Sequence, residues 1–285
     1  MKIQKIFEQV KMKLSVITIN YNNAEGLRNT LASVASQTCR DIEHIIIDGG
    51  SKDGSVEVIK DYAGNVPYYV FWVSEPDNGI YNAMNKGICK ATGLYVQILN
   101  SGDILAAQDV VEKMLLASDN AGRPELLYGN MIKKDYTNGR IIGKSKRVEY
   151  SLRQYYSSTM NHDCCYIRRN LFGQYGLYDE GLKIVSDWKW FLQAIGLGNV
   201  KPIYVDIDVT IFDASGISET NLALRNQERR QVLEQVLPPA VLADYDKHAF
   251  ETQQMDRFRK HHVYGLVYFV ERVLFKLEKW HILHR

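Results

Sequence analysis

Short apolar runs alternate with helix-like segments along the first 117 residues of the chain. Each apolar run ends in a polar loop, which predicts four buried strands at residues 14–19, 44–47, 69–73 and 95–99. Between these runs, apolar residues recur at helical spacing, which predicts a helix after each of the first three strands. Strands that alternate with helices form a mostly parallel sheet with helices on both faces. The sequence therefore predicts an α/β fold whose first half covers residues 13–117.

The pattern changes in the second half, residues 118–220. Further strands are predicted where apolar runs recur, at residues 126–133, 163–167 and 205–212, and the Asn-Gly pair at 138–139 is typical of a hairpin. Residues 145–160 are polar and aromatic, and we expect a mobile or substrate-facing segment there.

A helical stripe after residue 186 predicts that Trp188 packs in the core and that Trp190 remains free. Residues 221–285 indicate a helical C-terminal extension with a break at Pro238 and Pro239.

Composition narrows the class of protein. The chain has 285 residues, 46% of them hydrophobic, and a formal net charge of +2, which argues against a nucleic-acid partner. Its four cysteines show no CxxC spacing, so we expect reduced thiols in a cytoplasmic protein. Residues 1–13 resemble a short amphipathic helix and not a signal peptide, and no apolar run has the length of a membrane span.

Polar loops follow all four strands of the first half. The carboxyl ends of parallel strands meet at one edge of a sheet, where ligands of such folds bind. The last of these loops contains Asp103 after the strand at 95–99, and a carboxylate there suits Mg²⁺ or Mn²⁺. The alternative is a solvated Asp in an ordinary turn.

Three motifs in order make the pattern specific. They are SVITINYN at 15–22, IDGGSKDGS at 47–55, and ATG at 91–93 leading into YVQILNSGD at 95–103. Together they resemble family 2 glycosyltransferases of the GT-A fold, which has a Rossmann-like sheet. The stretch SEPDNGIYNAMNKG at 74–87 also resembles bacterial members that build polysaccharides. The resemblance is strong over residues 13–117 and fair to residue 218.

The resemblance implies a metal-dependent transfer. Asp103 matches the last carboxylate of the family's DXD-type motif, and the cation would bridge the diphosphate of a nucleotide-sugar. Gly102 stands where many members have a second Asp. His162 is a further candidate for a metal ligand or an acceptor contact, with a structural role as the alternative.

The resemblance also implies a nucleotide site. Asp48 matches the Asp that begins the family's base and ribose loop, whereas Gly49 stands where a uracil-reading Asp often follows, and UDP is the expected nucleotide. For Tyr21 and Lys86, an ordinary surface role is the alternative to contacts with base, ribose or phosphate. The full set of expected nucleotide contacts is Ile19, Tyr21, Asp48, Gly50, Ser51, Asp77, Lys86, Asn100 and Ser101.

Asp187 matches the carboxylate that acts as catalytic base in this family, at the start of a helix under the acceptor site. An inverting transfer needs one base to take the proton of the acceptor hydroxyl, and a helix N-terminus favours the ionised acid. The alternative is that Asp187 is only a first-turn residue that stabilises the helix dipole, and Asp179 and Glu180 are rival bases. The implied acceptor is a saccharide or a lipid-linked saccharide.

Two other classes of function remain open. They are a non-catalytic nucleotide-sugar-binding module and a sugar-phosphate nucleotidyltransferase, although the first loop lacks the glycine and basic residues that the latter usually needs. The aromatic and basic residues in 261–285 suit peripheral contact with the inner face of the cytoplasmic membrane. Packing on the main domain or in a homodimer is the alternative.

Overall fold

The computed structural model describes residues 13–135, 139–145, 147–148, 150–213, 221–260 and 264–283. The lead-in helix predicted for residues 1–13 therefore falls outside the described residues, except for its last position. Two compact units divide the chain, Met1–Gln231 and Val232–Arg285. The sheet and all predicted site residues belong to the first unit.

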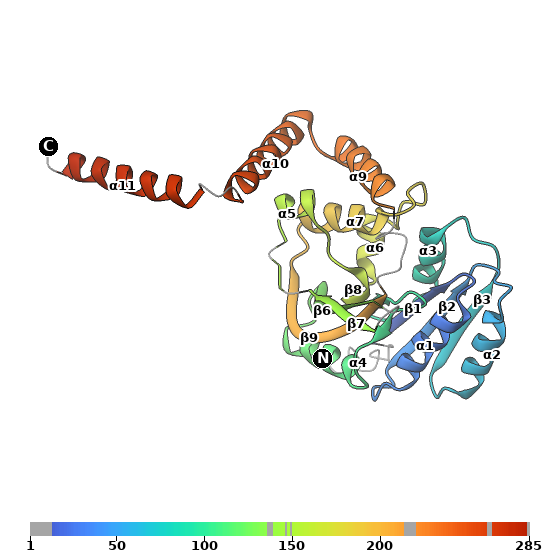
Figure 1. Ribbon diagram of the computed structural model, residues 1–285. Helices are drawn as coiled ribbons and strands as arrows, with labels where there is room; N and C mark the ends of the chain where they lie inside the picture. Colours follow the sequence, from blue (N-terminus) through green and yellow to red (C-terminus); the bar gives the residue numbers. More distant parts are fainter. Residues whose placement is uncertain are drawn as a thin grey trace, which may run out of the picture. The chain divides into compact units, whose positions relative to one another are not determined.

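Four parallel strands form one side of the sheet in the order β3-β2-β1-β4. Figure 1 shows β3, β2 and β1 side by side. They are β1 (Leu14–Asn20), β2 (Ile42–Asp48), β3 (Tyr69–Ser74) and β4 (Tyr95–Ile98), and the helices between them are α1 (Ala24–Ala35), α2 (Ser55–Asn65) and α3 (Ile80–Lys90). All four predicted strands are thus confirmed, with a helix after each of the first three. The parallel arrangement is confirmed as well.

The three helices cover opposite faces of this sheet. Neighbouring residues of a strand point to opposite faces, so Ile46 of β2 faces away from Ile45. Ile46 packs with α1 and α2 in a buried cluster that includes Leu27 and Tyr62. Ile45 pairs in register with Ile17 of β1, and α3 packs on Ile17 so closely that a Cβ at Gly87 would clash with it. Both faces of the sheet are therefore buried.

The second half of the chain extends the same sheet. β8 (Cys165–Arg168) runs antiparallel to β4, β6 (Leu126–Asp135) antiparallel to β8, and β9 (Pro202–Asp213) parallel to β6. β7 (Arg140–Lys144) pairs antiparallel with β6, as the Asn-Gly signal predicts, although residues 136–138 of the turn lie outside the described residues. The short strand β5 (Ile104–Leu105) and helix α4 (Val110–Asn120) were not predicted. Within the described residues the sheet has nine strands.

Shorter helices follow β7. They are α5 (Leu152–Ser157), the 3₁₀ turn η1 (His162–Cys164), α6 (Asn170–Tyr175), and α7 (Ser186–Phe191), which continues into the π-helical turn η2 (Leu192–Gly196). Trp188 is buried, as predicted. The prediction that Trp190 is free was wrong. Its ring is 1% exposed, lies 4.9 Å from the Phe172 ring, and donates its N–H to the Gly176 carbonyl. Helix α7 is buried on two sides, which a single stripe does not reveal.

Within the segment 145–160, the described residues Tyr155 and Met160 are buried in the core. That the segment faces the substrate stays a prediction. Tyr155 is fully buried, and its carbonyl accepts a hydrogen bond from the indole of Trp188 at 2.9 Å. The C-terminal helices are α9 (Leu222–Val236), α10 (Pro239–Arg259) and α11 (Tyr264–Leu283), with the predicted break at Pro238 and Pro239. In the part of the chain that the structure describes, no helix is long and apolar enough to cross a membrane.

Candidate active site

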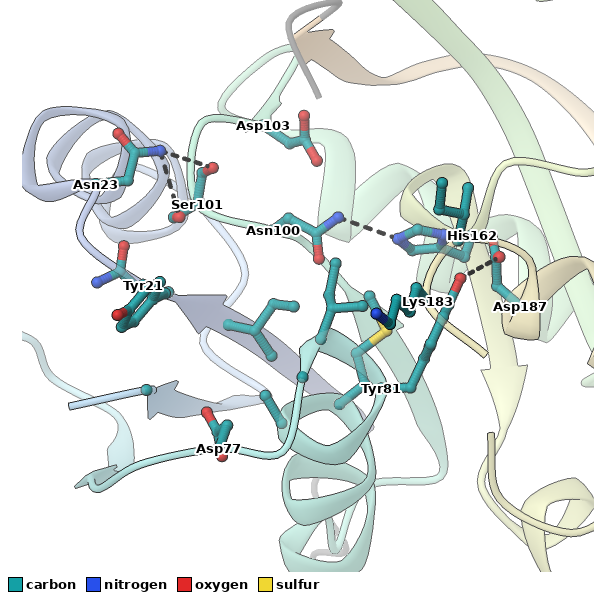
Figure 2. Close-up of a pocket in the computed structure, with 18 of the residues that line it drawn as sticks. Tyr21, Asn23, Asp77, Tyr81, Asn100, Ser101, Asp103, His162, Lys183 and Asp187 are labelled. Carbon is teal, nitrogen blue, oxygen red and sulfur yellow. Dashed lines mark hydrogen bonds and ion pairs between the residues drawn. The ribbon is translucent and has the colours of Figure 1, made fainter. Parts of the chain in front are cut away.

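A cavity of about 540 Å³ opens at the carboxyl ends of the parallel strands. Figure 2 shows Tyr21 and Asp77 on one side of it and Tyr81, Lys183 and Asp187 on the other. The loops after β1, β2, β3 and β4 meet there with α3, η1 and the start of α7. The predicted site residues that line it are Ile19, Tyr21, Asp77, Asn100, Ser101, Asp103, His162 and Asp187.

Four predicted nucleotide contacts lie outside the lining: Asp48, Gly50, Ser51 and Lys86. Asp48 is fully buried and accepts hydrogen bonds from Asn20 at 2.7 Å, the Ser51 hydroxyl at 2.6 Å and the Ser74 hydroxyl at 2.6 Å. Burial alone would raise the pKa of Asp48, but these donors outweigh it and lower the pKa. Asp48 therefore ties the ends of β1, β2 and β3 together beneath the cavity wall. Its contact with a nucleotide stays a prediction.

Lys86 is paired with carboxylates beside the cavity. Its ammonium group lies 2.6 Å from Asp77 and 2.7 Å from Glu75, and the hydrogen bond with Asp77 is the main cause of its raised pKa. The Asp77 side chain is itself 10% exposed and reaches the cavity. Lys86 thus orients Asp77.

Gly49 sits where the cavity wall leaves little room. A Cβ built on it would lie 3.1 Å from the Tyr21 ring and 3.2 Å from the Asp77 carboxylate. The Tyr21 side chain is 68% exposed, so its ring stands open at the mouth of the cavity. Because Gly49 has no side chain, both Tyr21 and Asp77 can approach its backbone closely.

Asp103 ends a tight turn after β4. Gly102 has a φ of +108°, a region that favours glycine, and its N–H donates to the Thr30 hydroxyl at 2.9 Å. Thr30 in turn donates to the Asp103 carbonyl at 2.8 Å. The turn is therefore held by α1, and the glycine at position 102 meets a backbone requirement.

Asp103 fits a divalent cation for which the protein and the substrate both supply ligands. The Asp103 residue is 3% exposed and lines the cavity, which gives one hard oxygen donor in a sheltered place. Among the described residues, no group of three or more His, Cys, Asp or Glu side chains could hold a metal by itself. Mg²⁺ is commonly held by one or two carboxylates together with phosphates and water, so a single Asp suits it.

Asp187 stands in the first turn of α7 and is held on both oxygens. Oδ1 accepts the hydroxyl proton of Tyr81 at 2.9 Å, and Oδ2 lies 3.1 Å from Nδ1 of His162. Nε2 of His162 lies 3.3 Å from the Asn100 amide nitrogen, which extends this chain of contacts to the loop of Asp103. Figure 2 shows these groups along one wall.

The Asp187 and His162 side chains are partly buried, 17% and 16% exposed, and their contact is an ion pair when His162 is protonated. Burial acts to raise the pKa of Asp187, but the bond and charge of His162 and the Tyr81 hydroxyl lower it overall. Burial acts to lower the pKa of His162, but Asp187 raises it overall. Asp187 is therefore a carboxylate at neutral pH.

The rival bases are engaged elsewhere, and neither is part of the lining. Asp179 pairs with Lys189 at 2.6 Å, and Glu180 accepts from the amides of Asn82 and Asn85, each at 2.8 Å. The contact of Asp179 joins the loop before α7 to α7 itself, and the contacts of Glu180 join it to α3. The structure thus favours Asp187 over both.

The sequence did not single out several residues of the lining. Tyr81 is separated from Asp187 by 106 positions, so no spacing rule connects them. Asn23 caps α1 through Gly26 and donates its amide to the Ser101 carbonyl at 3.1 Å, which joins two loops of the cavity. The sequence indicated Asn22 or Asn23 as the N-cap of this helix, which the structure confirms for Asn23, but not its place at the cavity. Lys183 adds an exposed cation to the wall.

Solved structures of other proteins share this fold. An S. aureus TarS 1-349 structure in complex with UDP-GlcNAc matches with a TM-score of 0.63 at 20% identity, over 78% of this chain and 64% of that chain. The mannosyltransferase PcManGT from Pyrobaculum calidifontis, in complex with GDP-Man and Mn²⁺, matches with a TM-score of 0.61 at 18% identity, over 84% and 69%. Both likenesses concern the fold, which is GT-A.

Sequence relatives are closer. An uncharacterized glycosyltransferase of Mycobacterium tuberculosis is 33% identical over 207 residues, covering 72% of this chain and 76% of that protein. The PGL/p-HBAD biosynthesis glycosyltransferase of Mycobacterium bovis is 28% identical over 208 residues, covering 72% and 79%. The profile of glycosyl transferase family 2 matches residues 15–176. The chain therefore belongs to glycosyl transferase family 2.

Proposed function

We propose that this glycosyltransferase moves a sugar from a nucleotide-sugar to a hydroxyl of a saccharide or lipid-linked saccharide in surface polysaccharide biosynthesis, with inversion at the anomeric carbon. The observation that carries the proposal is that Asp103 and Asp187 line one cavity, at the sheet edge where ligands of such folds bind. Asp103, which suits a cation, and Asp187, which suits the role of catalytic base, can thus act on the same bound substrate.

The donor occupies the side of the cavity formed by the loops after the parallel strands. Tyr21 stacks on the base, Asp77 contacts the ribose, and the loop of Asn100 and Ser101 lies under the diphosphate. UDP is the proposed nucleotide. Among solved structures of the same fold, one holds UDP-GlcNAc and another holds GDP-Man, so the base must be tested directly.

Asp103 would hold Mg²⁺ or Mn²⁺ together with the donor's diphosphate, and the cation would neutralise the negative charge that develops on the leaving group. Asp187 takes the proton of the acceptor hydroxyl while that oxygen forms a bond to the anomeric carbon. The bond from that carbon to the diphosphate oxygen breaks, so the nucleotide diphosphate leaves with the electron pair. Attack from the face opposite the leaving group inverts the configuration.

The neighbours of Asp187 prepare it for this step. Its oxygens are already directed by Tyr81 and His162, so little reorganisation precedes proton transfer. The lowered pKa of Asp187 keeps it ionised and able to accept a proton at neutral pH. Lys183 and Ile184 complete the wall beside it, where the acceptor enters.

The direct test is release of free nucleotide from UDP-, GDP- and TDP-sugars, each with Mg²⁺, Mn²⁺ or a chelator. We expect turnover of a UDP-sugar that the chelator abolishes, and a loss of about 10²- to 10⁴-fold in kcat for Asp187→Asn. Asp179→Asn is the matched control, since it removes a neighbouring carboxylate outside the cavity lining. A folded Asp187→Asn protein with full activity would refute the base, and turnover unaffected by the chelator would refute the cation.

We also propose that α11 lies on the inner face of the cytoplasmic membrane. Its exposed apolar side chains include Phe269, Leu274 and Phe275, and Arg272 and Lys276 on the same helix suit anionic headgroups. Full-length protein should sediment with phosphatidylglycerol vesicles, whereas a chain that ends at residue 260 should not. Equal sedimentation of both would contradict the proposal, and a concentration-dependent dimer lost on truncation would indicate a homodimer instead.

A further inference from the structure

Glu228 is a buried carboxylate on α9, beyond the residues that match the family profile. Its side chain accepts hydrogen bonds from three consecutive main-chain N–H groups. Oε1 accepts from Lys183 at 2.7 Å, and Oε2 accepts from Ile184 at 2.9 Å and Val185 at 3.3 Å. A buried carboxylate is costly unless donors satisfy it, and here the donors are main-chain groups of one short segment.

That segment, residues 183–185, leads directly into Asp187. Lys183 and Ile184 line the cavity, so the segment forms part of the wall on the side of the proposed base. Helix α7 begins at Ser186 and is only six residues long, and Val185 at its N-cap position provides no side-chain cap. The N-terminus of α7 is therefore held from outside, by Glu228.

Arg229, the next residue of α9, contacts the residue that follows Asp187 in the sequence. The Arg229 guanidinium lies 5.1 Å from the centre of the Trp188 ring, which is itself buried. Adjacent residues of one helix thus contact the chain just before and just after Asp187. Tyr81 and His162 direct the carboxylate of Asp187, whereas α9 determines where its backbone lies.

We propose that Glu228 is a positioning residue for sugar transfer: by binding the three N–H groups of residues 183–185, it sets the place of Asp187 relative to the acceptor. This inference rests on the proposed role of Asp187 as base. Glu228→Gln keeps the shape of the side chain but removes the charge and replaces one accepting oxygen with a donor. At least one N–H then loses its partner, and the segment shifts.

A shift of the base by about 1 Å lowers the rate by up to about 100-fold, so we expect kcat to fall about 10- to 100-fold in Glu228→Gln. The donor side, around Tyr21 and Asp77, is formed by other loops. The KM for the nucleotide-sugar should therefore change less than about 3-fold. A smaller folded fraction would also lower the apparent kcat at an unchanged KM, so kcat is calculated per folded molecule. The double variant described next separates positioning from folding.

The experiment compares full-length wild type with Glu228→Gln, Glu228→Asp, Asp187→Asn and the double variant Asp187→Asn/Glu228→Gln. Glu251→Gln, an exposed glutamate of α10, is the matched control. Nucleotide release gives kcat and KM, at a temperature where circular dichroism finds each variant folded. If Glu228 acts through Asp187, adding Glu228→Gln to Asp187→Asn should lower kcat no further.

The outcomes separate this inference from the proposed function. Full activity of Asp187→Asn would refute the base and with it this inference. An inactive Asp187→Asn beside a Glu228→Gln with wild-type kcat would refute the positioning role alone. A further fall in the double variant would mean that Glu228 acts elsewhere. If Glu228→Gln does not fold, the kcat of Glu228→Asp, which keeps the charge on a shorter side chain, decides: a wild-type value refutes the role.

Discussion

The hydrogen bond from Tyr81 to Asp187 offers a sharp test of how the proposed base is prepared. Tyr81→Phe removes one hydroxyl and keeps the ring, which is 4% exposed and packs 5.7 Å from the Tyr178 ring. The lost bond is charge-assisted, because the Tyr81 hydroxyl donates to a carboxylate at 2.9 Å. Such bonds contribute about 1.5–3 kcal/mol. Because the bond already exists before proton transfer, its loss lowers kcat through the orientation of the carboxylate. A misplacement of a reacting group by about 1 Å lowers a rate by up to about 100-fold, so we expect kcat to fall about 10- to 100-fold.

The same substitution also has a signature in the pH profile. The Tyr81 hydroxyl is one of the groups that lower the pKa of Asp187, so its removal should raise that pKa towards the ordinary value of an aspartate. Activity requires the ionised carboxylate and is lost as pH falls through its pKa. The acid limb of kcat against pH should therefore move to higher pH in Tyr81→Phe. At pH 7 Asp187 is ionised in both proteins, so the lower activity of the variant there reflects the orientation of the Asp187 carboxylate.

The assay is nucleotide release at saturating substrates between pH 3 and pH 9, so that it covers the acid limb, with folding checked at each pH. Tyr178→Phe is the matched control, because that buried hydroxyl has no hydrogen-bond partner among the described residues and its removal leaves Asp187 held as before. An unchanged kcat and an unmoved acid limb in Tyr81→Phe would refute the reasoning. A similar loss in Tyr178→Phe would attribute the effect to packing.

Two further predictions concern stability. Burial lowers the pKa of His44 to about 3. Below pH 6.5 the unfolded chain therefore binds a proton at this residue that the folded chain does not bind. As a result, the free energy of unfolding should fall by about 2 kcal/mol between pH 8 and pH 5. Urea unfolding at both pH values measures this, and His44→Gln should flatten the dependence; equal slopes would contradict it. Gly102→Ala should lower the free energy of unfolding by about 1–3 kcal/mol, because φ at this residue is +108°. Gly102→Asp should lose a similar amount, and no loss in either variant would show that the turn tolerates a side chain.

The sequence alone determined the parallel half of the fold and the location of most of the site. Strand periodicity, helical spacing and turn residues are local signals, and a parallel sheet brings the ends of its strands to one edge. Tyr21, Asp77 and Asp103 could be assigned to that edge from local patterns, because each follows a predicted strand.

Only the tertiary structure decided how the proposed base is held. Tyr81 and His162 reach Asp187 from positions 106 and 25 residues away, and Glu228 reaches Lys183 from 45 residues away. Such contacts depend on which elements pack together and not on the periodicity of any one of them. The burial of Trp190 was missed for the same reason, since the second side of α7 is covered by residues from α6 and the loop after it. Local patterns indicate what a segment forms, and packing between distant segments decides which side chains meet.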